Sequence, residues 1–504
     1  MSFRQVEPLG KVRTKIVATV GPASRAPTML RAMVEAGVDV FRLNFSHGSH
    51  DEHTATLRAI REVADDAGRM IAVLQDLGGP KIRLGPIPGD SIDCQPGDEF
   101  VLTAGRTSDD PHQLTCTDAS VPGELRPGNV VYFADGTVAM TVADVDEGGA
   151  RLTVTLAGRL RSSQGINLPD APLSVKALTP KDLLDLDWTA GHPVEYIGLS
   201  FVRRAADVTL LREELDRRGI GARIVAKIEK PQAVADLDAI IAVSDAVMVA
   251  RGDLGVEMDV ARVPAIQKRV IAACHRARVP VITATQMLNS MEISNRPTRA
   301  EASDVFNAVL DGTDAVMLSG ETAIGAFPVE AVSTMSRIAT EAETLLFARQ
   351  GDAWLQFDAA SSPASPAATV ASTPGQAWRH AGWVQPITEG LVEAASLVSR
   401  RLGAALLVVA THSGRTALAL SKQRHAAPTL ALADTAETAR AMALYWGVTP
   451  LHSAEITDID QALAFALDWA RARDLLAPGD RVVLVRGTIP GNPTHNAMLI
   501  QEVE

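Results

Sequence analysis

Short apolar runs recur along the first two thirds of this chain, and polar, helix-like segments separate them. Eight runs are typical of buried strands, at residues 14–21, 38–46, 70–77, 195–202, 223–229, 246–254, 280–288 and 315–322. Helical patterns occupy residues 27–36, 52–66, 205–217, 260–278 and 298–310 between them, and 328–349 after the last. Alternating strands and helices indicate a parallel sheet, and eight repeats favour closure into a (β/α)8 barrel, or TIM barrel.

The helical period disappears between Leu77 and Glu195. Residues 85–170 instead contain β-rich runs such as "NVVYFADGTVAMTVADV", punctuated by Gly, Pro and Asp turns. We interpret residues 81–172 as a small β-barrel-like domain inserted after the third strand. We name it the lid, because domains inserted over the catalytic face of a barrel commonly close over the site. The barrel then comprises residues 1–80 and 173–350.

A second change of pattern separates the barrel from a C-terminal α/β unit. Residues 351–386 include "AASSPASPAATVASTPG", an Ala/Ser/Pro-rich segment that predicts a linker. Residues 387–504 then contain strands at 405–411, 429–433 and 481–487, and helices at 388–401, 416–424, 435–446 and 458–473. We expect this unit to be a separate, regulatory domain.

Composition narrows the class of protein without naming a function. The chain of 504 residues carries a net charge of -12, which argues against a general nucleic-acid or membrane surface. Its three cysteines form no metal-ligand spacing, and neither the N-terminus nor any apolar run predicts a secretory signal or a membrane span. We therefore expect a cytoplasmic protein with reduced thiols.

Two carboxylates follow neighbouring strands at the predicted mouth of the barrel. Glu229 ends the fifth strand, and Asp253 ends the sixth within "RGDLG". Residues at the C-terminal ends of barrel strands converge on one site. Two carboxylates, completed by substrate oxygens and water, suit Mg²⁺. We therefore predict a metal site here; the alternative is that both residues merely cap the helices that follow.

Two cations belong to the same predicted mouth. Lys227 lies two residues before Glu229 and so points to the same side of the strand. An unpaired buried lysine is costly, which favours a role in stabilising a developing anion over a purely structural ion pair with Glu229. Arg42, on the second strand, suits a phosphate group, and alternation points it into the mouth together with Asn44 and Ser46.

Other polar residues surround these. Asn44 and Ser46 fit a monovalent ion or a nucleotide, whereas His47 fits a helix cap equally well. Asp76 ends the third strand, and Lys81 and Arg83 follow the turn "LGGP", which also fits a plain hinge.

In the C-terminal unit, "THSGRT" joins a strand to a helix, an arrangement that suits anion binding but also occurs in turns that bind nothing. The Gly-rich residues 486–496 are expected to fold over the same pocket.

Taken together, these motifs resemble those of the pyruvate kinase family, in the family's order along the chain. The similar segments are "KIVATVGPAS", "FRLNFSHG", "GPKIRLG", "GINLPD", "AKIEKP", "VMVARGDLGVE", "ITATQML", "RPTRAEASDVFNAVLDGTDAVMLSGETAIGAFPVEAV" and "SGRT". The resemblance implies transfer of a phosphoryl group from phosphoenolpyruvate to ADP, giving pyruvate and ATP, the last step of glycolysis. It also implies Mg²⁺ or Mn²⁺ as cofactor, a homotetramer, and a phosphometabolite effector site in the C-terminal domain.

The resemblance also implies roles for single residues. Glu229 and Asp253 hold the metal, and the catalytic residues are Lys227, Arg42 and Thr285. The substrate-binding residues are Arg251, Gly252, Asp253, Thr285 and Lys227. The monovalent-cation site matches Asn44, Ser46, Asp76 and Leu77, with Lys81 as a substitute for the ion. The nucleotide-binding residues are Asn44, His47 and Arg83, and Ser319 and Glu321 match a network beside the site. The effector-binding residues are Thr411, Ser413, Gly414, Arg415 and Thr416.

Two departures from the family's pattern change what is expected. Many members have Thr-Lys-Gly-Pro-Glu after the aspartate, where this chain has Leu77, Gly78, Gly79, Pro80 and Lys81. Members with lysine at the last position resemble the potassium-independent ones, so K⁺ is not expected to be required. Gln164 replaces the lysine that usually precedes the "GVNLPG" motif, so the lid is not expected to supply a cation to the nucleotide.

Two other functions are compatible with parts of the pattern. A lyase or aldolase on a (β/α)8 barrel also uses carboxylate-bound Mg²⁺ on an enolate, but it leaves "FRLNFSHG" and the lid unexplained. A non-catalytic sensor that binds phosphometabolites through the C-terminal unit is the other, and it would be favoured by loss of Lys227, Glu229 or Asp253. None of the three is lost.

Overall fold

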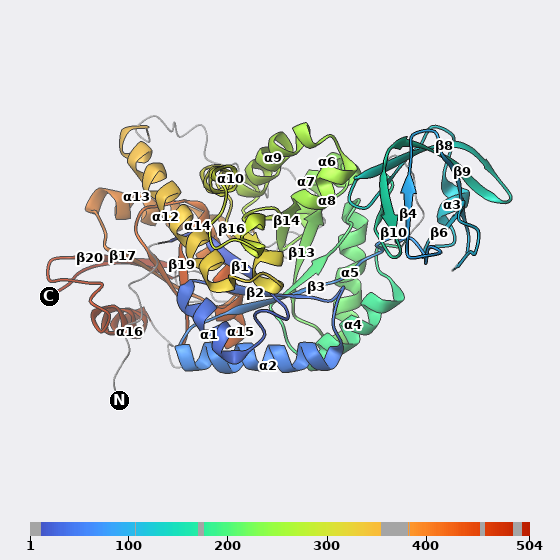
Figure 1. Cartoon of the computed structure of the whole chain (residues 1–504). Coiled ribbons are helices and arrows are strands. Elements are labelled where there is room, and N and C mark those ends of the chain that lie inside the picture. The colour runs from blue at the N-terminus through green and yellow to red at the C-terminus, as the bar shows by residue number, and fades with distance from the viewer. Residues whose placement is uncertain are drawn as a thin grey trace.

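The computed structural model describes residues 12–105, 107–169, 176–353, 382, 384–453, 459–486 and 496–504. Eight parallel strands close into a barrel in the order β1-β16-β15-β14-β13-β12-β3-β2 (Figure 1), which confirms the predicted TIM barrel. The strands are β1 (Lys15–Val20), β2 (Val40–Asn44), β3 (Ala72–Asp76), β12 (Tyr196–Leu199), β13 (Arg223–Ile228), β14 (Ala246–Ala250), β15 (Val281–Ala284) and β16 (Ala315–Leu318).

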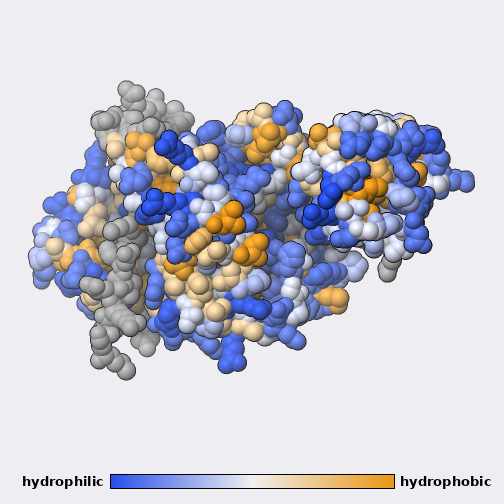
Figure 2. Space-filling model, in the orientation of Figure 1, coloured by the Kyte–Doolittle hydropathy of each residue, from blue (hydrophilic) through white to orange (hydrophobic). Residues whose placement is uncertain are grey.

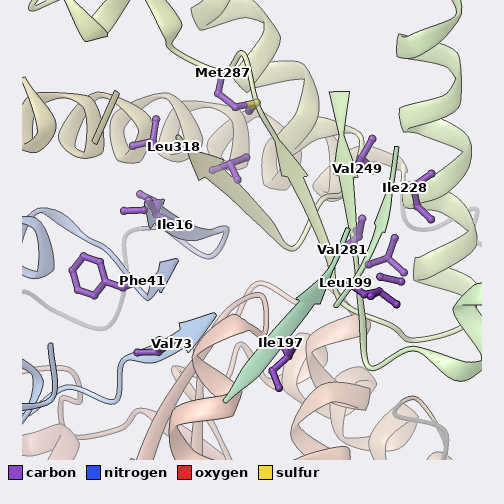
Figure 3. Packing of buried hydrophobic residues seen from close by; sticks show 14 of the residues in the cluster. Ile16, Phe41, Val73, Ile197, Leu199, Ile228, Val249, Val281, Met287 and Leu318 are labelled. Carbon is purple, nitrogen blue, oxygen red and sulfur yellow. The ribbon is translucent and has the colours of Figure 1, made fainter. Parts of the chain in front are cut away.

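Alternation along the strands divides their side chains between two environments. One set packs between the strands and the surrounding helices (Figure 3), for example Ile16, Phe41, Val73 and Val249. The intervening set faces the barrel axis and forms a separate cluster, which includes Val17, Val40, Leu74, Tyr196, Val225 and Met248. Near the carboxyl ends of the strands, the inward-facing side chains are polar. Arg42, Asp76 and Lys227 therefore lie at this end of the barrel, which is its mouth.

Helices surround the barrel, and most were expected from the sequence. They are α1 (Pro27–Ala36), α2 (His50–Ala67), α4 (Pro180–Gly191), α5 (Ala205–Arg218), α6 (Pro231–Ala235), α7 (Leu237–Val243), α8 (Arg251–Glu257), α9 (Val263–Arg276), α10 (Arg299–Leu310), α11 (Gly320–Ala323) and α12 (Pro328–Ala353). The predicted strand ends at 251–254, 285–288 and 319–322 are wrong. β14 passes directly into α8, β15 ends at Ala284, and α11 begins at Gly320.

The sequence interpretation also missed α4. Thr179 caps this helix through a reciprocal pair of hydrogen bonds with Asp182, and Pro180 occupies its first turn. Both are helix-start signals. The helical period therefore resumes before Glu195, and α4 completes the repeat between the lid and β12.

The lid consists of short strands inserted between β3 and β12. A six-stranded sheet runs in the order β11-β7-β8-β9-β5-β6, and β10 pairs with β4. The elements are β4 (Ser91–Cys94), β5 (Glu99–Thr103), β6 (Gln113–Thr115), α3 (Val121–Glu124), β7 (Val130–Phe133), β8 (Val138–Asp146), β9 (Gly149–Leu156), β10 (Gly158–Arg161) and β11 (Ile166–Asn167). They enclose their own apolar cluster, which includes Phe100, Val131 and Leu152, and they lie at one end of the molecule (Figure 1).

A polar contact joins the lid to the barrel at α8. Asn167 Nδ2 donates to Glu257 Oε1 at 2.9 Å, and the ammonium of Lys230 donates to the same oxygen at 2.6 Å. Glu257 is buried and ends α8, the helix whose first turn carries Asp253. The last strand of the lid is therefore tied to the helix that carries a predicted metal ligand.

The C-terminal domain contains a five-stranded sheet in the order β19-β18-β17-β20-β21, with β21 antiparallel. The strands are β17 (Leu406–Thr411), β18 (Thr429–Ala433), β19 (Val448–His452), β20 (Arg481–Arg486) and β21 (Ala497–Glu502). The helices are α13 (Pro386–Leu402), α14 (Arg415–Lys422), α15 (Ala436–Ala441) and α16 (Ile459–Arg471). β17, β18 and β20 were expected, and the two edge strands were not. Residues 487–495 and most of the predicted linker lie outside the described residues.

The C-terminal domain closes the floor of the barrel, opposite the mouth. The inward cluster of the barrel continues into residues of this domain such as Leu407, Val409 and Met442. Tyr196 donates its hydroxyl to the carbonyl of Ala441 at 2.7 Å. In addition, Lys422 and Arg424 pair with the buried Asp314, at 2.6 and 3.0 Å. The barrel floor is thus packed against the C-terminal domain.

Candidate active site

A buried lysine is the centre of the polar mouth. Lys227 Nζ lies 3.2 Å from Asp76 Oδ1 and 3.1 Å from Glu229 Oε1, and it donates to Ser200 Oγ at 2.8 Å. Burial by itself lowers the pKa of Lys227, but the charges of Asp76 and Glu229 outweigh burial and raise it above the ordinary value. The ammonium is therefore charged at neutral pH.

Arg42 adds a second cation on the other side of Asp76. Its Nε donates to Asp76 Oδ2 at 2.7 Å, and its Nη1 donates to Thr19 Oγ1 at 3.0 Å. Burial by itself raises the pKa of Asp76, and Lys227 and Arg42 together hold that pKa below its usual value. One buried carboxylate thus fixes two cations at the mouth.

Glu229 has one oxygen bound by the protein and one without a hydrogen-bond partner. Phe201 N, on a residue with a left-handed φ of 55°, donates to Oε2 at 2.6 Å. Oε1 is buried and pairs with the ammonium of Lys227 at 3.1 Å, but among the described residues no other group binds it. Burial, opposed by Lys227, raises the pKa of this carboxyl to about 7. A buried carboxylate oxygen that no backbone group occupies is a suitable ligand for a cation.

Asp253 is the second carboxylate of the predicted metal pair. It lies in the first turn of α8, its side chain is 30% exposed, and its charge also raises the pKa of Glu229. No group of three or more His, Cys, Asp or Glu side chains able to hold a metal occurs within the described part of the chain. Two carboxylates, Glu229 and Asp253, fit an ion such as Mg²⁺, which takes one or two carboxylates and completes its shell with substrate oxygens and water.

Thr285 forms a strained turn beside α8. Thr285 and Gln286 both have left-handed φ angles, of 65° and 54°. Thr285 Oγ1 accepts from Gly252 N and donates to Ala284 O, each at 2.7 Å. A Cβ on Gly252 would lie only 3.3 Å from that hydroxyl, so glycine permits the close approach. Non-glycine residues in this conformation cluster at functional sites.

Arg251 holds this turn in place through its guanidinium group. Its Nη2 donates to the carbonyls of Thr285, at 2.7 Å, and Gln286, at 3.2 Å, and its Nη1 pairs with Asp304 at 2.6 Å. The guanidinium is buried and fully engaged with these groups. This geometry gives the side chain a positioning role for the Thr285 turn.

The residues predicted for a monovalent cation or nucleotide lie along the β2 and β3 ends. Ser46 N donates to Asn44 Oδ1 at 3.1 Å, and the carbonyl of Leu77 accepts from Ser200 Oγ at 2.7 Å. His47 is exposed, and its carbonyl contacts His53 Nε2 at 2.9 Å. Its ring was considered as a helix cap, but Ser49 caps α2.

Lys81 and Arg83 follow the same turn but reach different places. Lys81 Nζ lies 4.0 Å from Asp253 Oδ1, with its side chain 32% exposed. None of the ion pairs and hydrogen bonds found in the described ranges joins Lys81 to Asn44, Ser46 or Asp76. Arg83 donates to the lid's own Ser163 carbonyl at 3.1 Å. Lys81 therefore lies near Asp253, whereas Arg83 is bonded within the lid.

Several residues of the site escaped the sequence interpretation. Ser200 bonds both Lys227 and the Leu77 carbonyl, and its position two residues beyond Gly198 on the inward face of β12 could have identified it. Lys181, in the unpredicted α4, donates to the Phe45 carbonyl at 2.7 Å and pairs with Asp185. In the predicted network after β16, Glu321 accepts from Leu288 N and Ser319 N, whereas Ser319 Oγ is buried and has no hydrogen-bond partner among the described residues.

The predicted effector residues lie in the C-terminal domain, apart from the mouth. Gly414, with a φ of 79°, caps α14, and its N–H donates to Thr411 Oγ1 at 3.1 Å. Thr416 is buried in α14, and Arg415 is half-buried at its start. The structure thus groups Lys227, Arg42, Glu229, Asp253 and Thr285 on the barrel and the effector residues elsewhere.

Comparison with known proteins gives matches over nearly the whole chain. The family model described as pyruvate kinase, barrel domain, matches residues 11–332, and that for the pyruvate kinase alpha/beta domain matches residues 389–501. Pyruvate kinase 2 of Synechocystis sp. is 40% identical over 496 residues, covering 97% of this chain and 78% of that protein. Pyruvate kinase of Methylorubrum extorquens is 40% identical over 487 residues, covering 97% and 96%.

A solved structure is similar over the same extent. The crystal structure of a pyruvate kinase from Cryptosporidium parvum has a TM-score of 0.85 and 32% sequence identity, covering 98% of this chain and 96% of that one.

Among the helices of the described residues, none is long and apolar enough to cross a membrane.

Proposed function

The chain belongs to the pyruvate kinase family and is an enzyme of that type; from this premise we propose that it transfers the phosphoryl group of phosphoenolpyruvate to ADP, with Mg²⁺ and without a requirement for K⁺. The observation that carries the proposal is the contact of Lys227 with Asp76 and Glu229 at the mouth of the barrel, with Arg42 beside them. The proposal, which follows the family, includes a homotetramer in the cytoplasm. Apolar side chains gather on the middle of the face in Figure 2.

An assay with phosphoenolpyruvate and ADP tests the proposal and separates the alternatives. Pyruvate formation, coupled to NADH oxidation by added lactate dehydrogenase, is expected only when both substrates and Mg²⁺ are present. Pyruvate formed without ADP would favour a lyase. No pyruvate at all, together with binding of phosphometabolites, would favour the sensor.

Glu229 and Asp253 are the proposed metal ligands. Oε1 of Glu229, which faces the Lys227 ammonium, and the partly exposed Asp253 offer two carboxylate oxygens, which supports Mg²⁺ or Mn²⁺ at this position. When bound, the ion would neutralise charge on the substrate's phosphate and carboxylate oxygens. The residues of the chain then provide the remaining cations and the orientation of the substrate.

Lys227 and Arg42 are proposed to stabilise the phosphoryl group in transfer. Both cations are held in place by Asp76 before the substrate arrives. A fixed cation lowers a barrier most when negative charge develops next to it, because no reorganisation is needed at that moment. This pair therefore supports in-line transfer between two oxygens at the mouth.

Gly252, Asp253 and Thr285 are proposed to hold the substrate carboxylate. The Thr285 hydroxyl and the first turn of α8 are held together by a 2.7 Å hydrogen bond. That arrangement supports a role for Thr285 beside the enolate carbon that is protonated to give pyruvate. Arg251 is proposed to take part in binding through the turn that it forms with Gly252 and Asp253, and its guanidinium also positions the Thr285 turn. Asn44, His47 and Arg83 remain the proposed nucleotide residues.

Glu229→Gln tests the metal site without relying on turnover. We expect Mn²⁺ binding to the free enzyme, followed by electron paramagnetic resonance of unbound Mn²⁺, to weaken at least tenfold because a neutral amide replaces a charged ligand. Glu213→Gln, at an exposed position on α5, is the matched control and should bind Mn²⁺ normally. Equal binding by both variants would exclude Glu229 as a ligand.

Lys81 is the proposed reason for potassium independence. Its ammonium lies 4.0 Å from Asp253 and so places one positive charge among the carboxylates of the mouth. We expect KCl to raise kcat/KM less than tenfold when added to tetramethylammonium buffer containing Mg²⁺. Activation of tenfold or more, about 1.4 kcal/mol of transition-state stabilisation, would contradict the proposal. Lys81→Glu should lose activity in tetramethylammonium and regain part of it with KCl, whereas Lys268→Glu, on exposed α9, should not respond.

The domain boundaries are also proposed, as residues 1–80 and 173–350 for the barrel, 81–172 for the lid, 351–386 for the linker and 387–504 for the C-terminal domain.

The loop at 411–416 is proposed to bind a phosphometabolite that regulates the enzyme, with Thr411, Ser413, Gly414, Arg415 and Thr416 as candidate contacts.

A further inference from the structure

The chain crosses between the barrel and the lid twice, and one carboxylate binds both crossings. The chain leaves the barrel after β3 at residues 77–81 and returns at residues 176–179, just before α4. In the outgoing crossing, Gly79 N donates to Asp182 Oδ1 at 3.1 Å. In the returning crossing, Thr179 N and Thr179 Oγ1 donate to Asp182 Oδ2 at 2.8 and 2.7 Å. Asp182 therefore lies at the point where the lid joins the barrel.

Asp182 itself is a fixed part of the barrel. It is fully buried in the first turn of α4. This helix is bound to β3 through Gln75, whose Nε2 donates to the Asp185 carbonyl at 3.2 Å and whose Oε1 accepts from Thr189 Oγ1 at 2.5 Å. Leu186 of the same helix packs in the core between the strands and the helices. The lid is thus attached to an element that the barrel holds in place.

The outgoing crossing is tightly constrained at Gly79. Gly79 has a left-handed φ of 62°, and a Cβ on it would lie only 2.9 Å from the Cβ of Ser200. Lys81 N donates to the Gly79 carbonyl at 2.8 Å, so a tight turn ties the backbone of Lys81 to Gly79. The position of Gly79 therefore sets the point from which the Lys81 side chain extends towards Asp253.

Resting on the proposal that Lys81 replaces K⁺, we infer that Asp182 is a positioning residue that anchors the lid to the barrel and holds Lys81 beside Asp253. A carboxylate forms stronger hydrogen bonds than a neutral acceptor, and burial shields these bonds from water. Asp182 acts through Gly79 and does not itself contact Asp253 or Lys81. Loss of its charge should therefore loosen the lid and the Lys81 ammonium together.

The simpler role for Asp182 is the capping of α4, because Thr179 and Asp182 form a capping box. That role uses Oδ2. The hydrogen bond from Gly79 uses Oδ1 and is not part of the cap, since Gly79 lies 103 residues from Asp182 in the chain. Thr179→Ala weakens the cap and leaves the Gly79 hydrogen bond in place, so this variant separates the two roles.

Distances between the lid and the barrel, measured by pulsed electron paramagnetic resonance on the full-length protein, test the anchor without relying on turnover. One spin label is attached at Glu147→Cys, in the exposed turn between β8 and β9, and the other at Arg269→Cys, on the exposed face of α9. The three native cysteines are buried, so the introduced cysteines are the ones that react.

Asp182→Asn is expected to widen the distribution of lid-to-barrel distances. Asparagine keeps the volume of the side chain but removes the charge and one of the two acceptor oxygens. Asp187→Asn makes the same change on the same helix, where the side chain is 60% exposed, and should leave the distribution as in the wild type. Thr179→Ala should also leave it unchanged, although it weakens the same end of α4.

The same variant is expected to acquire a response to potassium. In tetramethylammonium buffer containing Mg²⁺, Asp182→Asn should lower kcat/KM about tenfold or more, which is the factor that one charge-assisted hydrogen bond represents. KCl should restore part of this loss, because the ion supplies the charge that a displaced Lys81 no longer provides. Thr179→Ala and Asp187→Asn should respond to KCl as the wild type does.

Three results would overturn this inference. An unchanged distance distribution in Asp182→Asn would show that the lid is not anchored at this carboxylate. Equal widening by Thr179→Ala would assign the effect to the helix cap. Widening without any response of Asp182→Asn to KCl would show that Asp182 does not hold Lys81. A potassium requirement in the wild type would instead contradict the proposed function, and the distance measurement would still decide the role of Asp182.

Discussion

Lys227→Met is expected to lower kcat by at least about 10²–10³-fold, while the Kd for Mg²⁺–phosphoenolpyruvate changes no more than several-fold. The ammonium is fixed between Asp76 and Glu229 before substrate binds. Its charge is therefore most valuable when the phosphoryl group loosens from one oxygen and has not yet joined the next. Methionine keeps most of the volume of the side chain and removes only the charge.

The measurement separates binding from turnover. Steady-state kinetics give kcat, and quenching of protein fluorescence by phosphoenolpyruvate gives the Kd. Lys268→Met removes a lysine whose side chain is 61% exposed and should leave both values unchanged. If Lys227→Met keeps kcat and raises only the Kd, the residue binds the ground state and has no particular role in the transfer.

Lys422→Met is expected to destabilise the protein by about 3 kcal/mol, at the lower end of the cost of breaking a buried ion pair. Lys422 and Asp314 are almost fully buried and lie 2.6 Å apart across the interface between the two domains. Burial by itself raises the pKa of Asp314, but Lys422 and Arg424 hold that pKa below its usual value. Without Lys422, the Asp314 charge remains buried with Arg424 as its one remaining ion-pair partner among the described residues.

The urea midpoint of unfolding measures this loss of stability. The control variant removes a lysine from an ion pair at the surface. Lys268→Met breaks a pair with Asp311 at the surface, where such pairs contribute about 0–1 kcal/mol. The double variant Asp314→Asn, Lys422→Met should lose less than the sum of the two single variants, because the two residues interact directly. Equal midpoints for Lys422→Met and Lys268→Met would show that the buried pair is not needed for stability.

The sequence predicted the barrel well because one pattern determines both its strands and its site. Inward positions on β2 and β3 are apolar at the floor and become Arg42 and Asp76 at the mouth, and on β13 the inward Val225 is followed by Lys227. Period-two alternation therefore assigns these side chains to one place without any knowledge of three-dimensional distances. Ser200 follows the same rule and needed only the same count along β12.

Other features of the molecule depend on contacts that a linear pattern does not contain. The approach of Lys81 to Asp253 joins residues on opposite sides of the lid insertion. The contacts of Arg251 with the Thr285 and Gln286 carbonyls depend on where β14 ends and α8 begins. Gly252 and Gly255 are unusual in a helix, so the sequence pattern did not predict the start of α8. Pro450 likewise prevented the prediction of β19, which tolerates proline because it is an edge strand.

The junction of Asn167, Glu257 and Lys230 couples the position of the lid to that of Asp253, the proposed metal ligand. Asn167 belongs to the lid, and Glu257 ends the seven-residue helix whose first turn carries Asp253. If the lid swings away, the buried Glu257 loses a hydrogen-bond donor, and the helix that carries Asp253 loses one of its supports. Any ion that prefers Asp253 in its supported position must therefore favour the closed lid, and a closed lid must strengthen ion binding by the same factor.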